Sequence, residues 1–404
     1  FPSAAVAWRV IDENFLKDQN TFSDLKLRLS YGQTGNNGTG GGLNPLASLS
    51  LIGSNFVNIG DGVIQTAFVS GLANQDLTWE RTNEWNFGLD FGLLKNRLTG
   101  TLDVYNRKNT NIIFFRPVPS ATGYSGVFDN VGEATNKGVE LGISSKNIVQ
   151  KDFRWTTSVN FASNRNKITQ LYGGVDEILF SVQAGSYIHK VGHPIGSIYN
   201  YEFDGIWQLD EAEAAKKVGQ LPGQVKVKDL DGNGIINADD RKVLGSAMPK
   251  WTGGITNTFD YKNFDFSFFV YTSQGAFSNS YFHISHTGGF DATPARFNSM
   301  KTNYWTPENP SNEWYQPSNN GPYASALQYR DVSFVRVGYI TLGYSLNPSF
   351  LERMRIKSAR LYLTGQNPFT FSKYDGFDPE TAVRNSYASA HMTRTWMGGI
   401  NIKF

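Results

Sequence analysis

The sequence predicts an all-β protein: a transmembrane antiparallel β-barrel wall of about eleven spanning strands with long extracellular loops. Three observations lead to this prediction. Apolar residues recur with a period of two, the candidate strands are unusually long, and short and long connections alternate along the chain. The near balance of 37 basic and 35 acidic residues excludes a nucleic-acid binder, because no basic stripe is available to neutralise phosphates.

The period of two is clearest at 85–91, where Trp85, Phe87 and Leu89 share one face and polar residues lie between them. The strands of a soluble β-sandwich also alternate in this way, so strand length is needed to distinguish a sandwich from a membrane barrel. The candidates run for about 10 to 18 residues, whereas ordinary strands have about 5 to 6 and a bilayer needs about 9 to 11. The predicted spanning strands are 3–10, 24–34, 78–92, 97–108, 128–146, 153–168, 250–260, 263–275, 331–345, 355–368 and 392–404.

One of these strands changes its pattern. Within 331–345 the apolar positions shift parity between Val337 and Ile340, which predicts a β-bulge.

The connections sort into two classes along the chain. Short ones at 94–96, 147–152 and 261–263 alternate with long ones at about 35–77, 109–127, 169–249, 276–327 and 369–391. Short turns on one side and long extracellular loops on the other are typical of an outer-membrane barrel. The segment 169–249 is therefore predicted to be a single extracellular excursion. Its strand-like stretch 197–208 would not span the membrane, and 211–218 would form a short solvent-facing helix.

The last residues place Trp396, Ile400, Ile402 and Phe404 on one face, with an aromatic residue at the end of the chain. This pattern resembles the signal by which outer-membrane barrel proteins are recognised for insertion. An ordinary final strand of a soluble sheet remains the alternative.

The sharpest local motif is the acidic segment 229–240, which fits a calcium-binding loop. Oxygen-bearing residues occupy positions 1, 3 and 5, a glycine at position 6 allows a tight turn, and a carboxylate closes the loop at position 12. The predicted Ca²⁺ ligands are Asp229, Asp231, Asn233, the backbone carbonyl of Ile235, Asn237 and Asp240. Asp240 replaces the usual glutamate, so we expect a weak structural site; a metal-free Asp/Asn/Gly-rich turn is the alternative.

The loop 276–327 is rich in aromatic residues. Tyr304, Trp305, Trp314 and Tyr315 are candidate substrate-binding residues, because aromatic faces stack on sugar rings and pack on peptide side chains. The alternative is that these side chains pack the loop itself.

Catalysis finds little support in the sequence. The five histidines lack metal-ligand spacing, and neither a phosphate-binding glycine loop nor a serine nucleophile elbow is evident. We therefore predict that the protein is not an enzyme.

Several stretches, in order along the whole chain, resemble the C-terminal half of the barrel in SusC/RagA-type TonB-dependent outer-membrane transporters. They are 77–80 (LTWE) with 82–84 (TNE), 130–133 (NVGE) with 136–140 (NKGVE), 192–196 (GHPIG), 204–207 (DGIW), the acidic loop from Asp229, 304–310 (YWTPENP), 365–369 (GQNPF) and 376–380 (GFDPE).

This resemblance implies a 22-stranded barrel in the outer membrane of a Gram-negative, Bacteroidetes-like bacterium. Residues 1–404 would form the C-terminal portion of that barrel, and the N-terminal plug is expected to be absent from this chain. The implied function is TonB-dependent import of oligosaccharides or peptides. The implied partners are a SusD-like surface lipoprotein, the N-terminal half of the barrel with its plug, TonB acting through that part, and outer-membrane lipid. Two alternatives stay open: a non-transporting barrel that anchors or assembles a surface complex, and a soluble all-β carbohydrate-binding protein.

Overall fold

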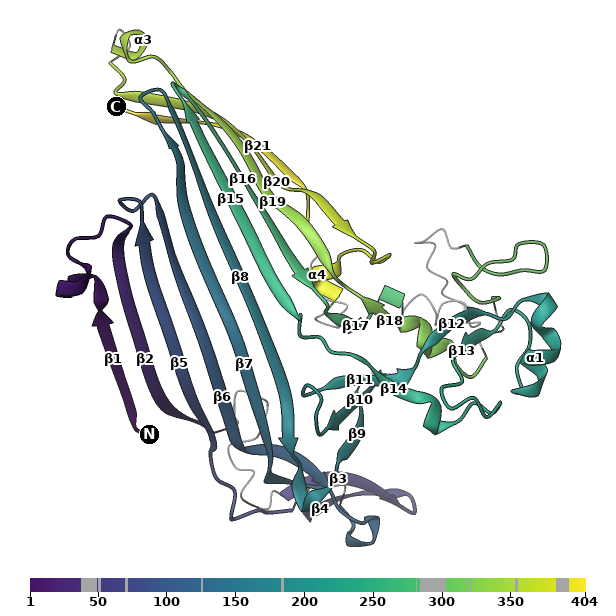
Figure 1. The fold of residues 1–404 in the computed structure, drawn as a ribbon. Helices are drawn as coiled ribbons and strands as arrows, with labels where there is room; N and C mark the ends of the chain where they lie inside the picture. Colours follow the sequence, from purple (N-terminus) through teal and green to yellow (C-terminus); the bar gives the residue numbers. More distant parts are fainter. Residues whose placement is uncertain are drawn as a thin grey trace.

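The computed structural model describes residues 1–37, 49, 52–69, 72–124, 126–182, 185–280, 282–283, 303–317, 319, 321–352, 355–382 and 392–404. Its main feature is an eleven-stranded antiparallel sheet in which strands follow one another in chain order (Figure 1). The strands are β1 (Ser3–Arg9), β2 (Phe22–Asn36), β5 (Glu80–Leu93), β6 (Leu98–Pro117), β7 (Gly126–Val149), β8 (Phe153–Gln170), β15 (Trp251–Tyr261), β16 (Phe264–Gln274), β19 (Phe334–Ser345), β20 (Ser358–Ser372) and β21 (Thr395–Lys403).

Each of the eleven predicted spanning strands is confirmed by one strand of this sheet. The sheet is open, with β1 and β21 at its two edges, so the chain forms only part of a barrel. Among the described residues, no helix has the length and apolar character needed to cross a membrane.

The predicted boundaries between the second long connection, 109–127, and the strands on either side of it were wrong. β6 has 20 residues and β7 has 24, so the connection predicted at about 109–127 shrinks to the residues between Pro117 and Gly126. The residues just before Ile112, at 109–111, are polar, and the strand continues through them. Asn111 adopts a positive φ of 56°, and the register with β7 skips between Asn109 and Ile112. A bulge therefore absorbs the polar residues within the strand.

The predicted bulge in β19 is confirmed. Facing β16, the register passes from Phe269 with Tyr339 to Val270 with Val337, which leaves Gly338 unpaired between them. The pairing of β19 with β20 shifts at the same point.

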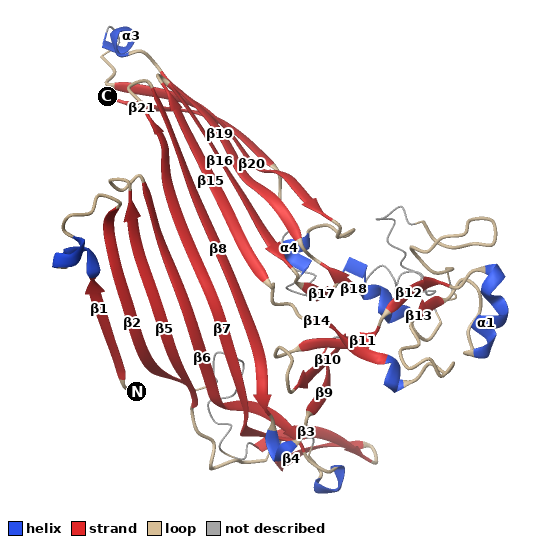
Figure 2. Cartoon of the chain, in the orientation of Figure 1, coloured by secondary structure: helices blue, strands red, loops and turns tan. Residues whose placement is uncertain are grey.

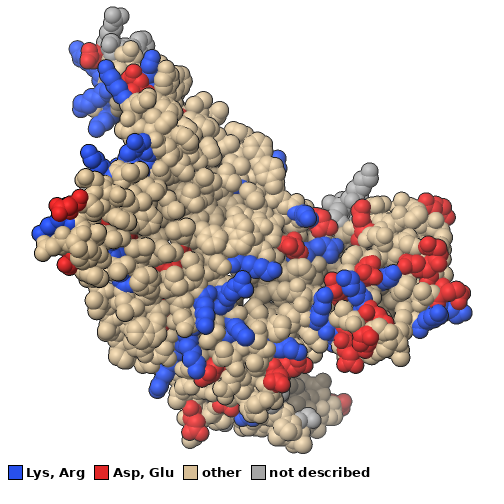
Figure 3. Space-filling view, viewed as in Figure 1, with Lys and Arg blue, Asp and Glu red and all other residues tan. Residues whose placement is uncertain are grey.

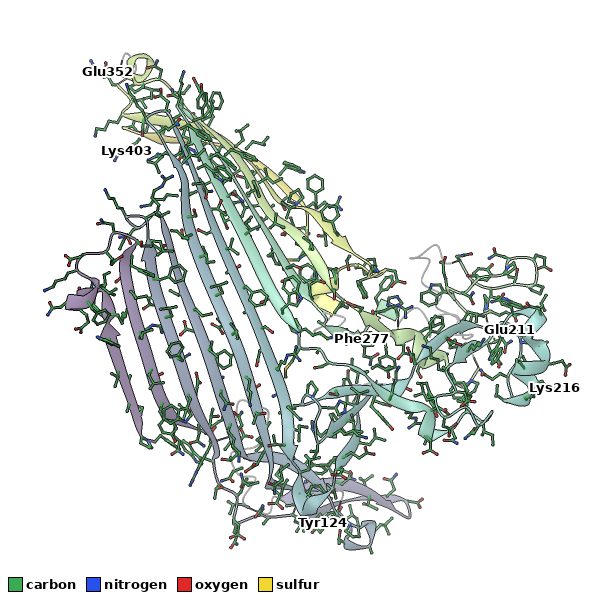
Figure 4. All side chains as sticks on the ribbon, viewed as in Figure 1. Tyr124, Glu211, Lys216, Phe277, Glu352 and Lys403 are labelled. Carbon is green, nitrogen blue, oxygen red and sulfur yellow. The ribbon has the colours of Figure 1, made fainter. Side chains whose placement is uncertain are left out.

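Short and long connections lie at opposite ends of the sheet, as predicted. The turns β5–β6, β7–β8 and β15–β16 lie at the end where Figure 4 labels Glu352 and Lys403, whereas Glu211 and Lys216 lie among the loops at the other end. We call these the turn end and the loop end. α3 (Pro348–Glu352) lies in the connection from β19 to β20 at the turn end.

The loop end carries small elements of its own (Figure 2). The stretch 197–208 lies outside the large sheet, as predicted, and the helix predicted at 211–218 is α1. The elements are the hairpin β3 (Ile52–Ile59) and β4 (Gly62–Val69), the sheet β9 (Glu177–Val182), β10 (Gly185–Lys190), β11 (Ser197–Tyr201) and β14 (Arg241–Gly245), the pair β12 (Phe203–Ile206) and β13 (Val225–Val227), the pair β17 (Phe277–Asn279) and β18 (Tyr329–Asp331), and the helices α1 (Ala212–Lys217) and α4 (Pro379–Ala382).

The two faces of the large sheet differ in chemistry because side chains alternate along each strand. One cross-strand row joins Leu29, Phe87, Val104 and Val139, all exposed and apolar. We call this side the apolar face and the opposite side, which carries most of the charged residues, the polar face. One face of the molecule shows few charges across the middle of the strands, while charged side chains gather near the strand ends and over the loops (Figure 3). An apolar outside and a polar inside are the properties of a membrane barrel wall.

Candidate functional site

The polar face carries an ion network built across three neighbouring strands. Arg28 of β2 donates hydrogen bonds of 2.9–3.1 Å to Asp90 of β5 and Asp103 of β6. The intervening strand position is Gly88, and a Cβ there would collide with the Arg28 guanidinium. Glycine therefore allows the arginine to lie flat over the backbone and bridge both carboxylates.

A second network fixes a loop onto the same face. Arg336 of β19 is 1% exposed and donates to Asp378 at 2.8 Å and to Glu380 at 2.7 Å. The hydroxyl of Tyr271 on β16 donates to Glu380 at 2.8 Å. Asp378 also accepts from the backbone nitrogen of Glu380, so it caps the start of α4. The β20–β21 loop is thus held against the barrel wall by one buried guanidinium.

A cavity of about 780 Å³ lies between these two networks on the polar face. Polar side chains, among them Asp103, Glu140 and Asn160, line one part of it, and the rings of Phe269 and Tyr271 line another. These rings stack with their centroids 5.4 Å apart. Carboxylates and an amide beside an aromatic platform can bind hydroxyl-rich or amide-rich ligands by hydrogen bonding and stacking.

No residue of this cavity or of the two networks was predicted from the sequence as a site residue. Glu140, Asp378 and Glu380 belong only to stretches that carry the family resemblance. The available signal was charge at the polar positions of alternating strands, as at Asp90 and Asp103. Which of these charges meet depends on strand register, which the pattern alone did not supply.

Three of the six predicted calcium ligands are aspartates, and these three come together in the structure. Oxygen atoms of Asp229, Asp231 and Asp240 lie within 4.8 Å of one another. Gly232 and Gly234 adopt positive φ values of 70° and 79°, which turn the loop tightly and direct their amides at Asp229 with N–O distances of 2.8 Å.

Two of the three remaining predicted ligands make hydrogen bonds within the loop through their side chains. The side chain of Asn233 hydrogen-bonds to Asp231 and to the Ile235 amide. The Asn237 side chain caps a short 3₁₀ turn. The Ile235 carbonyl stays a predicted ligand.

The donor set at this loop fits a hard divalent cation. The Gly234 amide hydrogen bond lowers the pKa of Asp229, so this carboxylate stays charged at neutral pH. Asp240 is fully buried and accepts 2.8 Å hydrogen bonds from the amides of Leu230 and Asn237. Each carboxylate oxygen has a second lone pair left for a metal, and carboxylate oxygens are the ligands that Ca²⁺ prefers.

The four predicted substrate-binding aromatics occupy different environments. Trp305, Trp314 and Tyr315 are 3%, 5% and 1% exposed, whereas Tyr304 is 41% exposed. Trp305 and Tyr315 belong to the apolar core of the loop region, and Trp314 stacks on His283. This arrangement matches the alternative reading, in which the aromatics pack the loop, for three of the four residues.

A serine, a histidine and an aspartate also meet at the loop end. Ser280 Oγ lies 2.7 Å from His283 Nδ1, and His283 Nε2 lies 2.9 Å from Asp375. A serine nucleophile needs an accessible hydroxyl, but Ser280 and His283 are fully buried and Ser280 also bonds the Tyr374 hydroxyl. Partial burial raises the pKa of Asp375, but the hydrogen bond and charge of His283 outweigh it and hold this pKa at about 2. The contact joins the β16–β19 loop to the β20–β21 loop.

His189 of β10 gives the loop region a built-in pH dependence. Its ring lies between those of Phe114 and Phe180, each with its centroid 4.6 Å away, and burial lowers its pKa to about 4. Because the unfolded pKa is about 6.5, protons bind the unfolded segment more readily, so local stability is complete above pH 6.5 and falls as pH drops towards 4.

We expect acidification from pH 7 to pH 4.5 to loosen β10, measured in the full protein as lower amide protection factors, that is, exchange rates compared with the intrinsic rate at each pH. The full shift corresponds to about 3 kcal/mol, which solvent around the half-buried ring reduces to roughly 1–2 kcal/mol. The variant His189→Phe should lose the pH dependence of exchange in β10. Equal pH dependence in both proteins would contradict this assignment.

Comparisons with known proteins agree on one relationship. The family described as "TonB dependent receptor-like, beta-barrel" matches residues 1–367. TonB-dependent receptor P3 of Formosa agariphila is 36% identical over 100% of this chain and 42% of its own length. TonB-dependent receptor SusC of Bacteroides thetaiotaomicron is 34% identical over 100% of this chain and 40% of its own length. Among solved structures, the RagAB peptide transporter superposes with a TM-score of 0.78 and 26% identity, over 100% of this chain and 43% of the matched chain. The chain thus spans less than half the length of these relatives.

Proposed function

The chain belongs to the TonB-dependent receptor-like β-barrel family, and from that premise we propose that it forms about half of the wall of an outer-membrane importer. The observation that carries this proposal is the polar face, where ion networks across the strands surround a cavity of about 780 Å³ while the opposite face is apolar. The named relatives are receptors, which agrees with the prediction that the chain is not an enzyme.

The imported substrate would be an oligosaccharide or a peptide. The aromatic platform of Phe269 and Tyr271 and the polar groups beside it suit either class. RagAB is described as a peptide transporter, and 34% identity links this chain to SusC. TonB would supply the energy through a plug in the remaining part of the barrel, and a SusD-like lipoprotein would cover the extracellular loops.

Uptake by the living bacterium tests this proposal. A strain lacking the whole gene would be incubated with neutral oligosaccharides of graded length and with a tryptic peptide mixture, and depletion from the medium would be followed by mass spectrometry. We expect one class to remain in the medium, with uptake restored by the intact gene and abolished by a protonophore. Unchanged uptake of both classes, together with loss of other proteins from the cell surface, would instead favour the anchoring barrel.

We also propose that the loop 229–240 binds Ca²⁺ as a structural ion. Asp229 and Asp231 would contribute ligand oxygens, while the buried Asp240 would hold the loop closed through its two amide hydrogen bonds. Such an ion would stiffen the connection between β13 and β14 without taking part in transport chemistry.

Calcium should raise the melting temperature of the purified full protein. At a concentration tenfold above the dissociation constant, the gain in unfolding free energy is about 1.4 kcal/mol, which corresponds to roughly 1–2 °C for a unit of 404 residues. Asp231→Asn should abolish the gain, whereas the control Asp210→Asn, an exposed acid before α1, should keep it. No shift in the wild type up to several millimolar Ca²⁺ would remove the metal assignment.

A further inference from the structure

A row of basic side chains crosses the apolar face near the loop end of β7 and β8. Lys137 and Arg165 are direct cross-strand partners, and both are exposed. Lys167, also exposed, lies two residues further along the same face. Figure 3 shows basic side chains gathered over the β6–β8 part of the sheet with few acidic ones between them.

This arrangement is unfavourable without an anion. Like charges directly opposite each other on neighbouring strands repel. In the part of the chain that the structure describes, no carboxylate forms an ion pair with Lys137, Arg165 or Lys167, whereas neighbouring Lys108 is paired with Glu133 at 2.8 Å. Two cations facing each other on an apolar surface create a site for an anionic group that both can contact.

The row lies at the depth of lipid headgroups. Trp155 stacks on Phe259 near the turn end of β8, in the position of an aromatic girdle, and Arg165 follows ten residues later on the same face. Ten residues that rise about 3.3 Å each, in strands tilted by about 40°, cover about 25 Å across the membrane, which is the height of the apolar band of a barrel. Because long loops face the cell exterior, the basic row falls in the outer leaflet.

The surface beside the row offers room for acyl chains. A shallow groove of about 460 Å³ is lined by Lys137 and Arg165 at one side and by Phe87, Val104 and Val139 at the other. The groove therefore has basic side chains at one end and an apolar floor. The floor residues belong to the exposed cross-strand row of the apolar face.

We propose that Lys137 and Arg165 bind a phosphate group of the phosphorylated glycolipid in the outer leaflet, with its acyl chains over Phe87, Val104 and Val139. This inference rests on the proposed outer-membrane placement of the chain. The charge complementarity and the continuity of the groove with the apolar face favour a lipid over a soluble ligand. The bound headgroup would relieve the repulsion between the two cations and fix the height of this wall in the bilayer.

The test is a binding titration of the full protein, purified in detergent and freed of lipid, with phosphorylated lipid A as the probe. Each basic group at a membrane surface contributes a factor of about five, so Lys137→Ser/Arg165→Ser should bind roughly 10- to 30-fold more weakly than wild type. Wild type should lose a similar factor when the same glycolipid has been enzymatically dephosphorylated. The control Lys146→Ser/Lys151→Ser removes two exposed basic residues at the turn end and should bind normally.

Three outcomes would overturn the inference: equal affinity of wild type and Lys137→Ser/Arg165→Ser, equal affinity for the dephosphorylated glycolipid, or complete competition by inorganic phosphate, which would indicate an ion site without a lipid. Melting temperatures check that the variants are folded. The titration is independent of uptake, so loss of transport with intact glycolipid binding would count against the proposed function alone.

Discussion

Replacing Arg336 with methionine is expected to lower the stability of the β20–β21 loop and the strands beneath it by about 3–5 kcal/mol. The guanidinium holds Asp378 and Glu380 and also donates to Thr370 at 3.0 Å. Removing it leaves Asp378, only 5% exposed, as a buried charge without a counter-ion. Thermal unfolding of the purified full protein in detergent and proteolysis of the loop measure the effect.

The loss of stability should come from the carboxylates that are left without a counter-ion, and not from the missing arginine side chain itself. The triple variant Arg336→Met/Asp378→Asn/Glu380→Gln removes the uncompensated charges and should recover much of the stability. Arg360→Met is the matched control: its ion pair with Asp265 lies on the same sheet, but both side chains are about one-third exposed (32% and 29%), so its loss should cost about 1 kcal/mol or less. If Arg336→Met melts like Arg360→Met, the buried network does not hold the loop.

The spanning strands were predictable from the sequence, whereas their exact ends were not. All eleven spanning strands and the bulge at Gly338 followed from alternation, because a strand that separates lipid from a polar interior must repeat every two residues. The extension of β6 through its polar run could not be read in this way. There a residue with positive φ, Asn111, interrupts the alternation without ending the strand.

The candidate site was less accessible to sequence reasoning than the fold. The loop at 229–240 could be predicted because its acidic and amide residues are close in sequence and its glycines indicate a turn. Arg28 and Asp103 are separated by 75 residues, and Arg336 meets acids more than 40 residues away. Such pairs depend on register and on how loops fold back, so periodicity identifies the polar face but not the contacts on it.

Truncating Trp305 to alanine is the second change for which we expect a large effect, a local destabilisation of about 3–5 kcal/mol. Its indole packs in the loop core formed with Ile206, Val225 and Leu327, and its Nε1 donates to Gln208 at 2.9 Å. The cavity left behind would be lined by both the β12–β13 pair and the 3₁₀ turn at 324–328. Amide hydrogen exchange of residues 201–230 in the full protein should accelerate strongly.

The neighbouring variant Tyr304→Ala is the control that separates packing from ligand binding. Tyr304 precedes Trp305 directly but is 41% exposed, so its truncation should change exchange little. If Trp305 served chiefly to contact substrate, Trp305→Ala would weaken uptake while residues 201–230 kept their protection from exchange. If it packs the loop, protection is lost first, and any loss of uptake follows from the collapse of the loop surface. The 3% exposure of Trp305 favours the second outcome, because a side chain enclosed by Val225 and Leu327 can reach a ligand only after the loop core opens.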